Sequence, residues 1–197
     1  MVCLFVYDIS VFFLSVMSDP NDILAVIYLQ QGKLTEAREL MQAKLLKRFH
    51  ELSLSCSGLA ESYLNVNNAD LVDKYYRLAI SVKQLLSPEG DGVLALANEY
   101  YSLGEALVKL NKNREALQVF QKMIALLQQN DLNRFGQVRD IWCFSELKLN
   151  ENPQPLHISY YEIFNTLFQQ PIYDSLRDDE EFEKILSELK DLTERLC

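Results

Sequence analysis

The sequence is poor in the residues that form tight turns, with only 6 glycines and 5 prolines among its 197 residues. A β-sandwich or barrel needs turn-forming residues between its many short strands, so this deficit argues against both architectures. The residues that are abundant, Leu, Ala, Glu, Gln and Lys, suit helices. Hydrophobic residues make up 49% and charged residues 24% of the chain, which is typical of a folded globular protein. We therefore predict an all-α fold.

Cysteine and histidine are also scarce. The chain has two histidines, and its four cysteines form no CxxC pair, since they are spread over the sequence as Cys3, Cys56, Cys143 and Cys197. A structural zinc site needs closely spaced Cys or His ligands, so we predict no metal site. Scattered cysteines are typical of small apolar side chains in a reducing compartment. This usage predicts a cytoplasmic protein.

Positive charge is in deficit as well, because 19 Lys and Arg face 28 Asp and Glu, for a formal net charge of −9. Phosphate backbones repel an acidic surface, which argues against direct binding of nucleic acid. The sequence contains no phosphate-binding loop, no Gly-rich dinucleotide fingerprint and no GxSxG motif. His50 and His157 have no recognisable nucleophile partner. We predict no catalytic residues, no enzymatic activity and no cofactor.

The first 17 residues, MVCLFVYDISVFFLSVM, are apolar except for two serines and Asp8. They lack the basic residues that begin a secretory signal. A membrane-spanning helix needs about 20 residues, and an aspartate near its centre costs roughly 2.5–3.5 kcal/mol. Three interpretations stay open: a buried element, a membrane anchor, or an artefact of start-site choice. Met17 is followed by Ser18 or Asp19 as a helix N-cap and by Pro20 as a first helical residue.

Three later segments, 21–46, 56–80 and 100–127, align with one another as two amphipathic helices around a polar turn. Small residues occupy one position of each first helix, at Ala25, Ala60 and Gly104. Small or β-branched residues recur in each second helix, at Ala37, Val72 and Ala116, and a large residue follows four positions later, at Met41, Tyr76 and Phe120. The turns carry residues that tolerate left-handed backbone, namely Gly32, Asn67 and Asn111.

This pattern resembles the tetratricopeptide repeat family, in which small residues let the two helices of each hairpin approach closely. Ala37 and Val72 are 35 residues apart, close to the family period of about 34. The next interval is longer and contains the helix-breaking residues 87–92. The resemblance implies tetratricopeptide-like helical hairpin repeats arranged as an α-solenoid. We predict antiparallel hairpins at 21–46, 53–86 and 93–129, within a repeat region of residues 18–130.

The repeat pattern decays after residue 130. We predict a degenerate fourth helical pair over residues 131–170, with helices at 135–148 and 156–168 whose aromatic residues, such as Trp142 and Phe164, pack in the core. Residues 171–197 are predicted to contain a capping helix. Its apolar residues form one stripe, made of Phe182, Ile185, Leu186, Leu189, Leu192 and Leu196.

Tetratricopeptide arrays hold peptides or proteins in a concave groove, which implies that this chain is a peptide- or protein-binding scaffold. Carrying the family positions over places the partner-binding groove at Leu29, Gln30, Glu61, Leu64, Asn65, Tyr101, Glu105 and Lys109. The last three are four residues apart and are predicted to share one solvent-accessible face, with Tyr100, Leu103 and Leu107 turned inward. Carboxylates on this face would repel an acidic peptide tail, so we expect a neutral or basic, partly apolar ligand.

A second resemblance gives an alternative function. Residues 20–197 look like the sensor domain that some bacterial transcriptional regulators attach to a helix-turn-helix, and the run from Tyr173 to Phe182 resembles the ending of such domains. Residues 1–20 contain no helix-turn-helix, so this interpretation requires a separate or missing DNA-binding part. An in-frame helix-turn-helix upstream would distinguish the regulator from the scaffold. The identity of the partner and the formation of a homodimer stay open.

Overall fold

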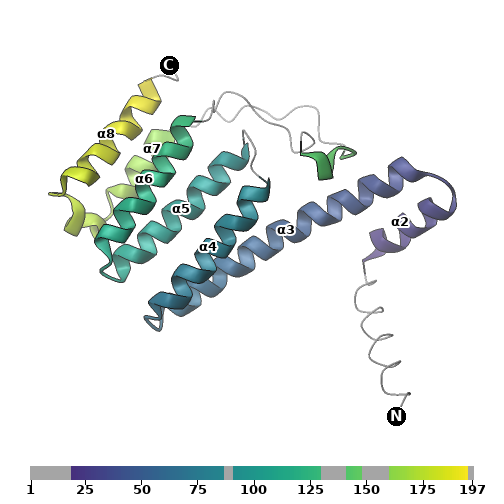
Figure 1. Ribbon diagram of the computed structural model, residues 1–197, viewed down its shortest axis with the longest axis horizontal. Coiled ribbons are helices and arrows are strands. Elements are labelled where there is room, and N and C mark those ends of the chain that lie inside the picture. Colours follow the sequence, from purple (N-terminus) through teal and green to yellow (C-terminus); the bar gives the residue numbers. More distant parts are fainter. Residues whose placement is uncertain (1–18, 87–90, 130–140, 148–159, 195–197) are drawn as a thin grey trace, which may run out of the picture. The chain divides into compact units, whose positions relative to one another are not determined.

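The computed structural model describes residues 19–86, 91–129, 141–147 and 160–194 (Figure 1). Within these residues the regular structure consists of seven α-helices and two short 3-10 helices, without any strand. The predicted all-α class is therefore confirmed. The chain divides into two compact units, residues 1–48 with 138–150, and residues 49–137 with 151–197. The apolar residues 1–17 lie outside the described residues.

The first unit contains α2 (Pro20–Gln30), the beginning of α3 (Leu34–Leu64) and the 3-10 helix η2 (Trp142–Phe144). The side chain of Asp19 accepts a hydrogen bond of 2.9 Å from the backbone N–H of Asn21 and so caps α2. A half-buried ion pair between Asp22 and Lys44 joins α2 to α3. The segment after η2 is held on α3 by Glu146, whose carboxylate lies 2.9 Å from Arg38.

Helix α3 is one continuous helix of 31 residues, whereas the sequence analysis predicted a break between residues 46 and 53. The prediction of two separate hairpins at this point is wrong. Residues 47–57 contain no proline or glycine, and therefore nothing in that stretch terminates the helix. Gly58 follows as the one weak helix former there, and a single interior glycine costs only about 1 kcal/mol. The division between the two units falls within this helix, after Arg48.

The second unit begins with the rest of α3 and continues through α4 (Ala69–Leu86), α5 (Asp91–Lys109), α6 (Asn113–Gln129), α7 (Tyr160–Phe168), the 3-10 helix η3 (Pro171–Leu176) and α8 (Glu180–Glu194). Helix α4 packs on α5, α5 on α6, and α8 on both α6 and α7 (Figure 1). Helix α3 meets α4 through the rings of Tyr63 and Tyr75, which are stacked at 5.6 Å. One hydrophobic core runs through these helices.

The turns between paired helices have the same backbone conformation in three places. Gly32, Asn67 and Asn111 have φ values of 74°, 54° and 58°, which confirms the left-handed backbone predicted for these positions. Each turn closes with an N–H that donates to the carbonyl five residues earlier: Lys33 to Tyr28 at 2.9 Å, Asn68 to Tyr63 at 3.0 Å, and Lys112 to Leu107 at 2.8 Å. This bond satisfies a free carbonyl at the helix end, so the three turns are equivalent.

The small residues of the repeat pattern lie where helices approach closely. Ala25, Ala37, Ala60, Val72, Gly104 and Ala116 are all buried. The closest approach involves Gly104 of α5 and the ring of Phe120 of α6, because a Cβ added at Gly104 would lie 2.2 Å from a ring carbon. Phe120 and its counterpart Tyr76 are completely buried, whereas Met41 in the first unit is 43% exposed. The large residue of the repeat pattern is therefore packed more tightly in the second unit than in the first.

Two predictions for residues 131–170 are wrong. Residues 141–147 form only the single turn of η2, instead of the end of a helix over 135–148, and residues 135–140 lie outside the described residues. Trp142 is 87% exposed, although it was predicted to pack in the core. Because η2 is a single 3-10 turn of three residues, it has no extended apolar face along which the Trp142 ring could be buried. The second helix of this region was predicted at 156–168, and α7 does end at Phe168.

Helix α8 buries its apolar stripe within the second unit. Phe182, Ile185 and Leu189 are each 1% exposed, and Leu186 and Leu192 are partly buried against the same core. The ring of Phe182 lies 5.5 Å from that of Phe168 in α7, in an edge-to-face arrangement. Leu196 lies outside the described residues. The first turn of α8 carries Glu180, Glu181 and Glu183, where the helix dipole favours negative charge.

Candidate functional site

Three of the predicted groove residues lie on one side of α3. Glu61 and Asn65 are exposed and Leu64 is half-buried, and their spacing of three and four residues places them on one helical face. The hydroxyl of Tyr76, which reaches over from α4, donates a hydrogen bond to the Glu61 carboxylate. Burial of Tyr76, followed by this hydrogen bond, raises the pKa of its phenol far above the ordinary value. The hydrogen-bond partner of the Glu61 carboxylate is therefore a neutral phenol and not a cation.

Two further predicted residues lie on α5. Glu105 is half-buried, and its carboxylate forms an ion pair of 2.6 Å with Lys109, which is exposed. The charge of Glu105 contributes to the raised pKa of Tyr76, as does that of Glu61. The negative charges of Glu61 on α3 and Glu105 on α5 therefore both act on one phenol. We refer to Glu61, Leu64, Asn65, Glu105 and Lys109 as the α3/α5 surface.

Tyr101 does not belong to this surface, and its predicted exposure is wrong. It is 6% exposed, and its hydroxyl forms a hydrogen bond of 2.8 Å with that of Tyr173 in η3. Its ring contacts other aromatic rings at centroid distances of 5.5–6.3 Å, namely Phe120, Phe164, Phe168 and Tyr173. Three of these rings, those of Phe164, Phe168 and Tyr173, lie more than 60 positions later in the sequence, so the helical pattern of α5 did not reveal them. Leu103 and Leu107 are buried as predicted, and Tyr100 is half-buried.

The remaining predicted groove residues, Leu29 and Gln30, are exposed at the end of α2. They belong to the first unit, whereas the other six belong to the second. Glu61, Leu64 and Asn65 lie on α3, and Glu105 and Lys109 lie on α5, all within the second unit.

A buried polar cluster connects α3, α4 and α5, and the sequence analysis missed it. Glu99 is 6% exposed; its carboxylate pairs with Lys83 at 2.6 Å and accepts a hydrogen bond of 3.0 Å from the hydroxyl of Ser57. Lys83 also donates to the backbone carbonyl of Ala95 at 3.2 Å. Burial, with the charge of Glu99 second, raises the pKa of the Cys56 thiol, which makes this cysteine a poor nucleophile. Lys83 and Glu99 are 16 residues apart on helices that were predicted to be neighbours. This spacing of opposite charges could have indicated the ion pair.

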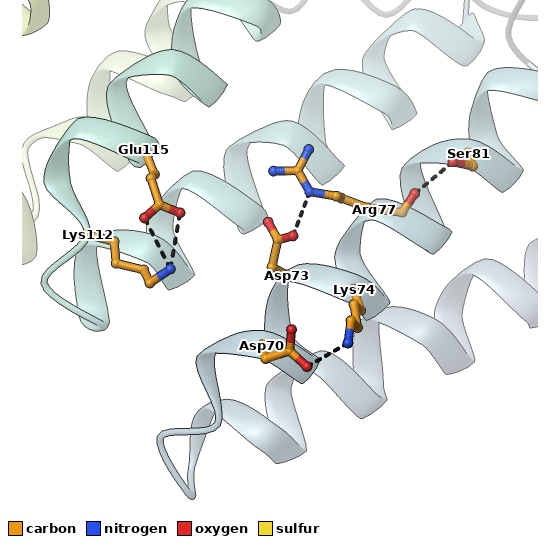
Figure 2. A network of polar contacts seen from close by, with 7 residues as sticks. All are labelled: Asp70, Asp73, Lys74, Arg77, Ser81, Lys112 and Glu115. Atoms are coloured by element: carbon orange, nitrogen blue, oxygen red, sulfur yellow. Dashed lines mark hydrogen bonds and ion pairs between the residues drawn. The ribbon is translucent and has the colours of Figure 1, made fainter.

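Exposed ion pairs occupy a different part of the second unit, on α4 and at the start of α6 (Figure 2). Asp70 pairs with Lys74 at 2.7 Å, and Asp73 pairs with Arg77 at 2.6 Å. Beside them, the carboxylate of Glu115 lies 3.1 Å from the ammonium group of Lys112. The hydrogen bond that Arg77 donates to Asp73 raises the pKa of Arg77. These are local pairs of opposite charge at helical spacing, each worth a few tenths of a kcal/mol (about 0.3–0.5), and they neutralise one another.

Among the described residues, no group of three or more His, Cys, Asp and Glu side chains is placed to hold a metal ion. None of the helices in the described ranges is both long enough and apolar enough to cross a membrane. No protein-family model matches the sequence, and comparisons with curated proteins and with solved structures found no match either. The described residues form a protein of paired helices, in which α3 and α5 carry charged, amide and apolar side chains.

Proposed function

We propose that this chain is a tetratricopeptide-type scaffold that binds a peptide or a protein segment on the α3/α5 surface. The carrying observation is that Glu61 of α3 accepts the hydrogen bond of the Tyr76 phenol and that the charge of Glu105 of α5 acts on the same phenol. Two adjacent helices thus present charged, amide and apolar side chains together. That mixture suits an extended polypeptide better than a small molecule, which needs a closed pocket.

The equivalent turns support the assignment to tetratricopeptide-type hairpins. All three have a residue with positive φ and the same closing hydrogen bond, and small residues lie at the contacts of the paired helices. In such an array the first helix of each hairpin lies in the inner, concave layer, and the second helix lies in the outer layer. We assign α3 and α5 to the inner layer, and we assign to α8 the role of closing the last hairpin.

The charges indicate the class of ligand. Glu61 is exposed and is hydrogen-bonded to a neutral phenol, whereas Glu105 is neutralised by Lys109. One carboxylate charge is therefore left on the surface, next to the half-buried Leu64. A segment with a basic residue and an apolar residue complements this surface, and an acidic segment is repelled.

A selection from a random peptide library with the immobilised full chain tests this proposal. We expect enriched peptides to contain Lys or Arg together with apolar residues. Binding of an enriched peptide, measured by fluorescence anisotropy, should weaken at least tenfold (about 1.4 kcal/mol) in the double variant Glu61→Gln, Asn65→Arg, which removes the surplus negative charge and adds a positive one. Both changes are at exposed positions, so the fold should be retained.

The matched control is the double variant Glu115→Gln, Gln118→Arg, which makes the same change of charge at two exposed positions of α6. It should bind the peptide within about twofold of the wild type. Equal loss of binding in both double variants, or a selection that enriches no peptide, would contradict the proposal.

A further inference from the structure

Exposed apolar side chains are concentrated in the first unit. Helix α2 buries only Ala25, while Ile23 is 54%, Val26 36% and Ile27 39% exposed. These three residues are spaced i, i+3 and i+4, so they form one stripe along the helix. The stripe is not isolated, because other large apolar residues of the same unit are also exposed: Leu29, Leu34, Met41, Leu45 and Trp142.

A helix of 11 residues is marginal in water unless an apolar face is covered. Within the first unit α2 is held by its cap at Asp19, by Ala25 and by the Asp22–Lys44 pair. None of these contacts uses Ile23, Val26 or Ile27. Contiguous exposed apolar residues of this kind mark an interaction surface more often than a surface that stays in contact with water.

The distribution of charge indicates which occupant the stripe suits. By sequence, the first unit contains 7 Lys and Arg and 7 Asp and Glu, while the second contains 12 and 21, which together make the 19 and 28 of the chain. The whole net charge of −9 therefore belongs to the second unit. Two copies that meet through their second units repel each other, whereas two first units are neutral and offer apolar stripes to each other.

We propose that the occupant of this stripe is a second copy of the same chain. The two copies form an isologous dimer in which α2 of one packs on α2 of the other, through Ile23, Val26 and Ile27. A two-fold interface needs a surface complementary to itself, and a neutral apolar stripe meets that requirement. The proposed contact uses residues of the first unit, none of which belongs to the α3/α5 surface of the second unit.

Sedimentation equilibrium of the full chain at roughly 10–100 μM, a range suited to micromolar affinities, tests the dimer. We expect a dimer for the wild type and a monomer for Ile27→Glu. The matched control is Leu78→Glu, which places the same charge at an exposed leucine of α4 in the second unit, and it should remain a dimer. Circular dichroism checks that both variants keep their helical content.

A second measurement does not depend on a charged substitution. Ile27→Cys should form a covalent dimer under mild oxidation much faster than Leu78→Cys, because residues near a two-fold axis approach their own copies. A monomeric wild type over this concentration range overturns the proposal. So does an Ile27→Glu variant that remains dimeric. A monomer whose melting temperature falls on Ile27→Glu also overturns it, since the stripe is then covered within one chain.

Discussion

At the scale of single residues, the distance between α5 and α6 is set by Gly104. Its missing side chain leaves space for the ring of Phe120, which is completely buried and has no room to move aside. Gly58 in α3 is the opposite case, because it is exposed and a Cβ there would meet nothing within 4 Å. The same residue type therefore serves packing at one position and has no packing role at the other.

We predict that Gly104→Ala and Gly58→Ala change the stability in opposite directions. Both gain up to about 1 kcal/mol of helix propensity. At Gly104 the added methyl group overpacks the contact with Phe120, which costs roughly 1–3 kcal/mol and outweighs that gain. Urea denaturation of the two variants measures the difference, and a stabilised Gly104→Ala variant would show that the close approach is not as described.

Three buried tyrosines link stability to alkaline pH. Burial raises the pKa values of Tyr76, Tyr101 and Tyr173 above the ordinary value, and hydrogen bonds to neighbouring oxygens raise those of Tyr76 and Tyr173 further. An unfolded tyrosine loses its proton near pH 10, while these three keep theirs in the folded chain. The free energy of unfolding should therefore be independent of their ionisation below pH about 10 and fall as the pH rises above it.

Thermal melts at pH values from about 8 to about 11, around the ordinary tyrosine pKa, measure this fall. The double variant Tyr101→Phe, Tyr173→Phe removes two of the three groups, so its stability should fall less steeply with pH. If ultraviolet absorbance shows every tyrosine ionising while the helical signal is intact, the pKa prediction is wrong.

At the scale of helices, α8 depends on the surface that it covers. Its buried residues Phe182, Ile185 and Leu189 contact the core through α6 and α7. Burying each of them is worth roughly 1.5–3 kcal/mol, against a total stability of about 5–15 kcal/mol for an ordinary domain. The helix is therefore a large contributor to the second unit.

Deleting residues 178–197 should expose the aromatic cluster around Phe168 and Tyr173. We expect the shortened chain to melt at a lower temperature and to aggregate or bind a hydrophobic dye. The variant Glu183→Gln, which changes an exposed side chain of the same helix, should behave as the wild type. A shortened chain that stays monomeric and equally stable would mean that α8 adds nothing to this core.

At the scale of the whole molecule, the net charge of −9 resides in one unit. Like charges in a compact unit repel one another, and salt screens that repulsion over a distance of about 10 Å at 0.1 M. We predict that raising NaCl from about 20 to about 200 mM increases the melting temperature. Sucrose at equal osmolality is the control for general solute effects. A melting temperature that falls with salt would indicate that attractive ion pairs outweigh the repulsion.

The sequence by itself determined the helical class and the turns. Helical class follows from residue propensity and spacing, and the turns at Gly32, Asn67 and Asn111 follow from the local tolerance of Gly and Asn for positive φ. The burial of Ala60, Val72 and Ala116 was likewise readable from their periodic spacing. These properties depend on residues a few positions apart, and a sequence pattern records such relations directly.

Only the tertiary structure decided which polar and aromatic residues form the surface. Tyr101 is buried because η3 and α7 fold back over it, and Glu99 is buried because Lys83 and Ser57 come from two other helices to pair with it. Leu29 and Gln30 belong to a different compact unit from Glu61. Each of these outcomes depends on contacts between distant segments, and the periodicity within a single helix carries no information about which neighbour will cover a given face.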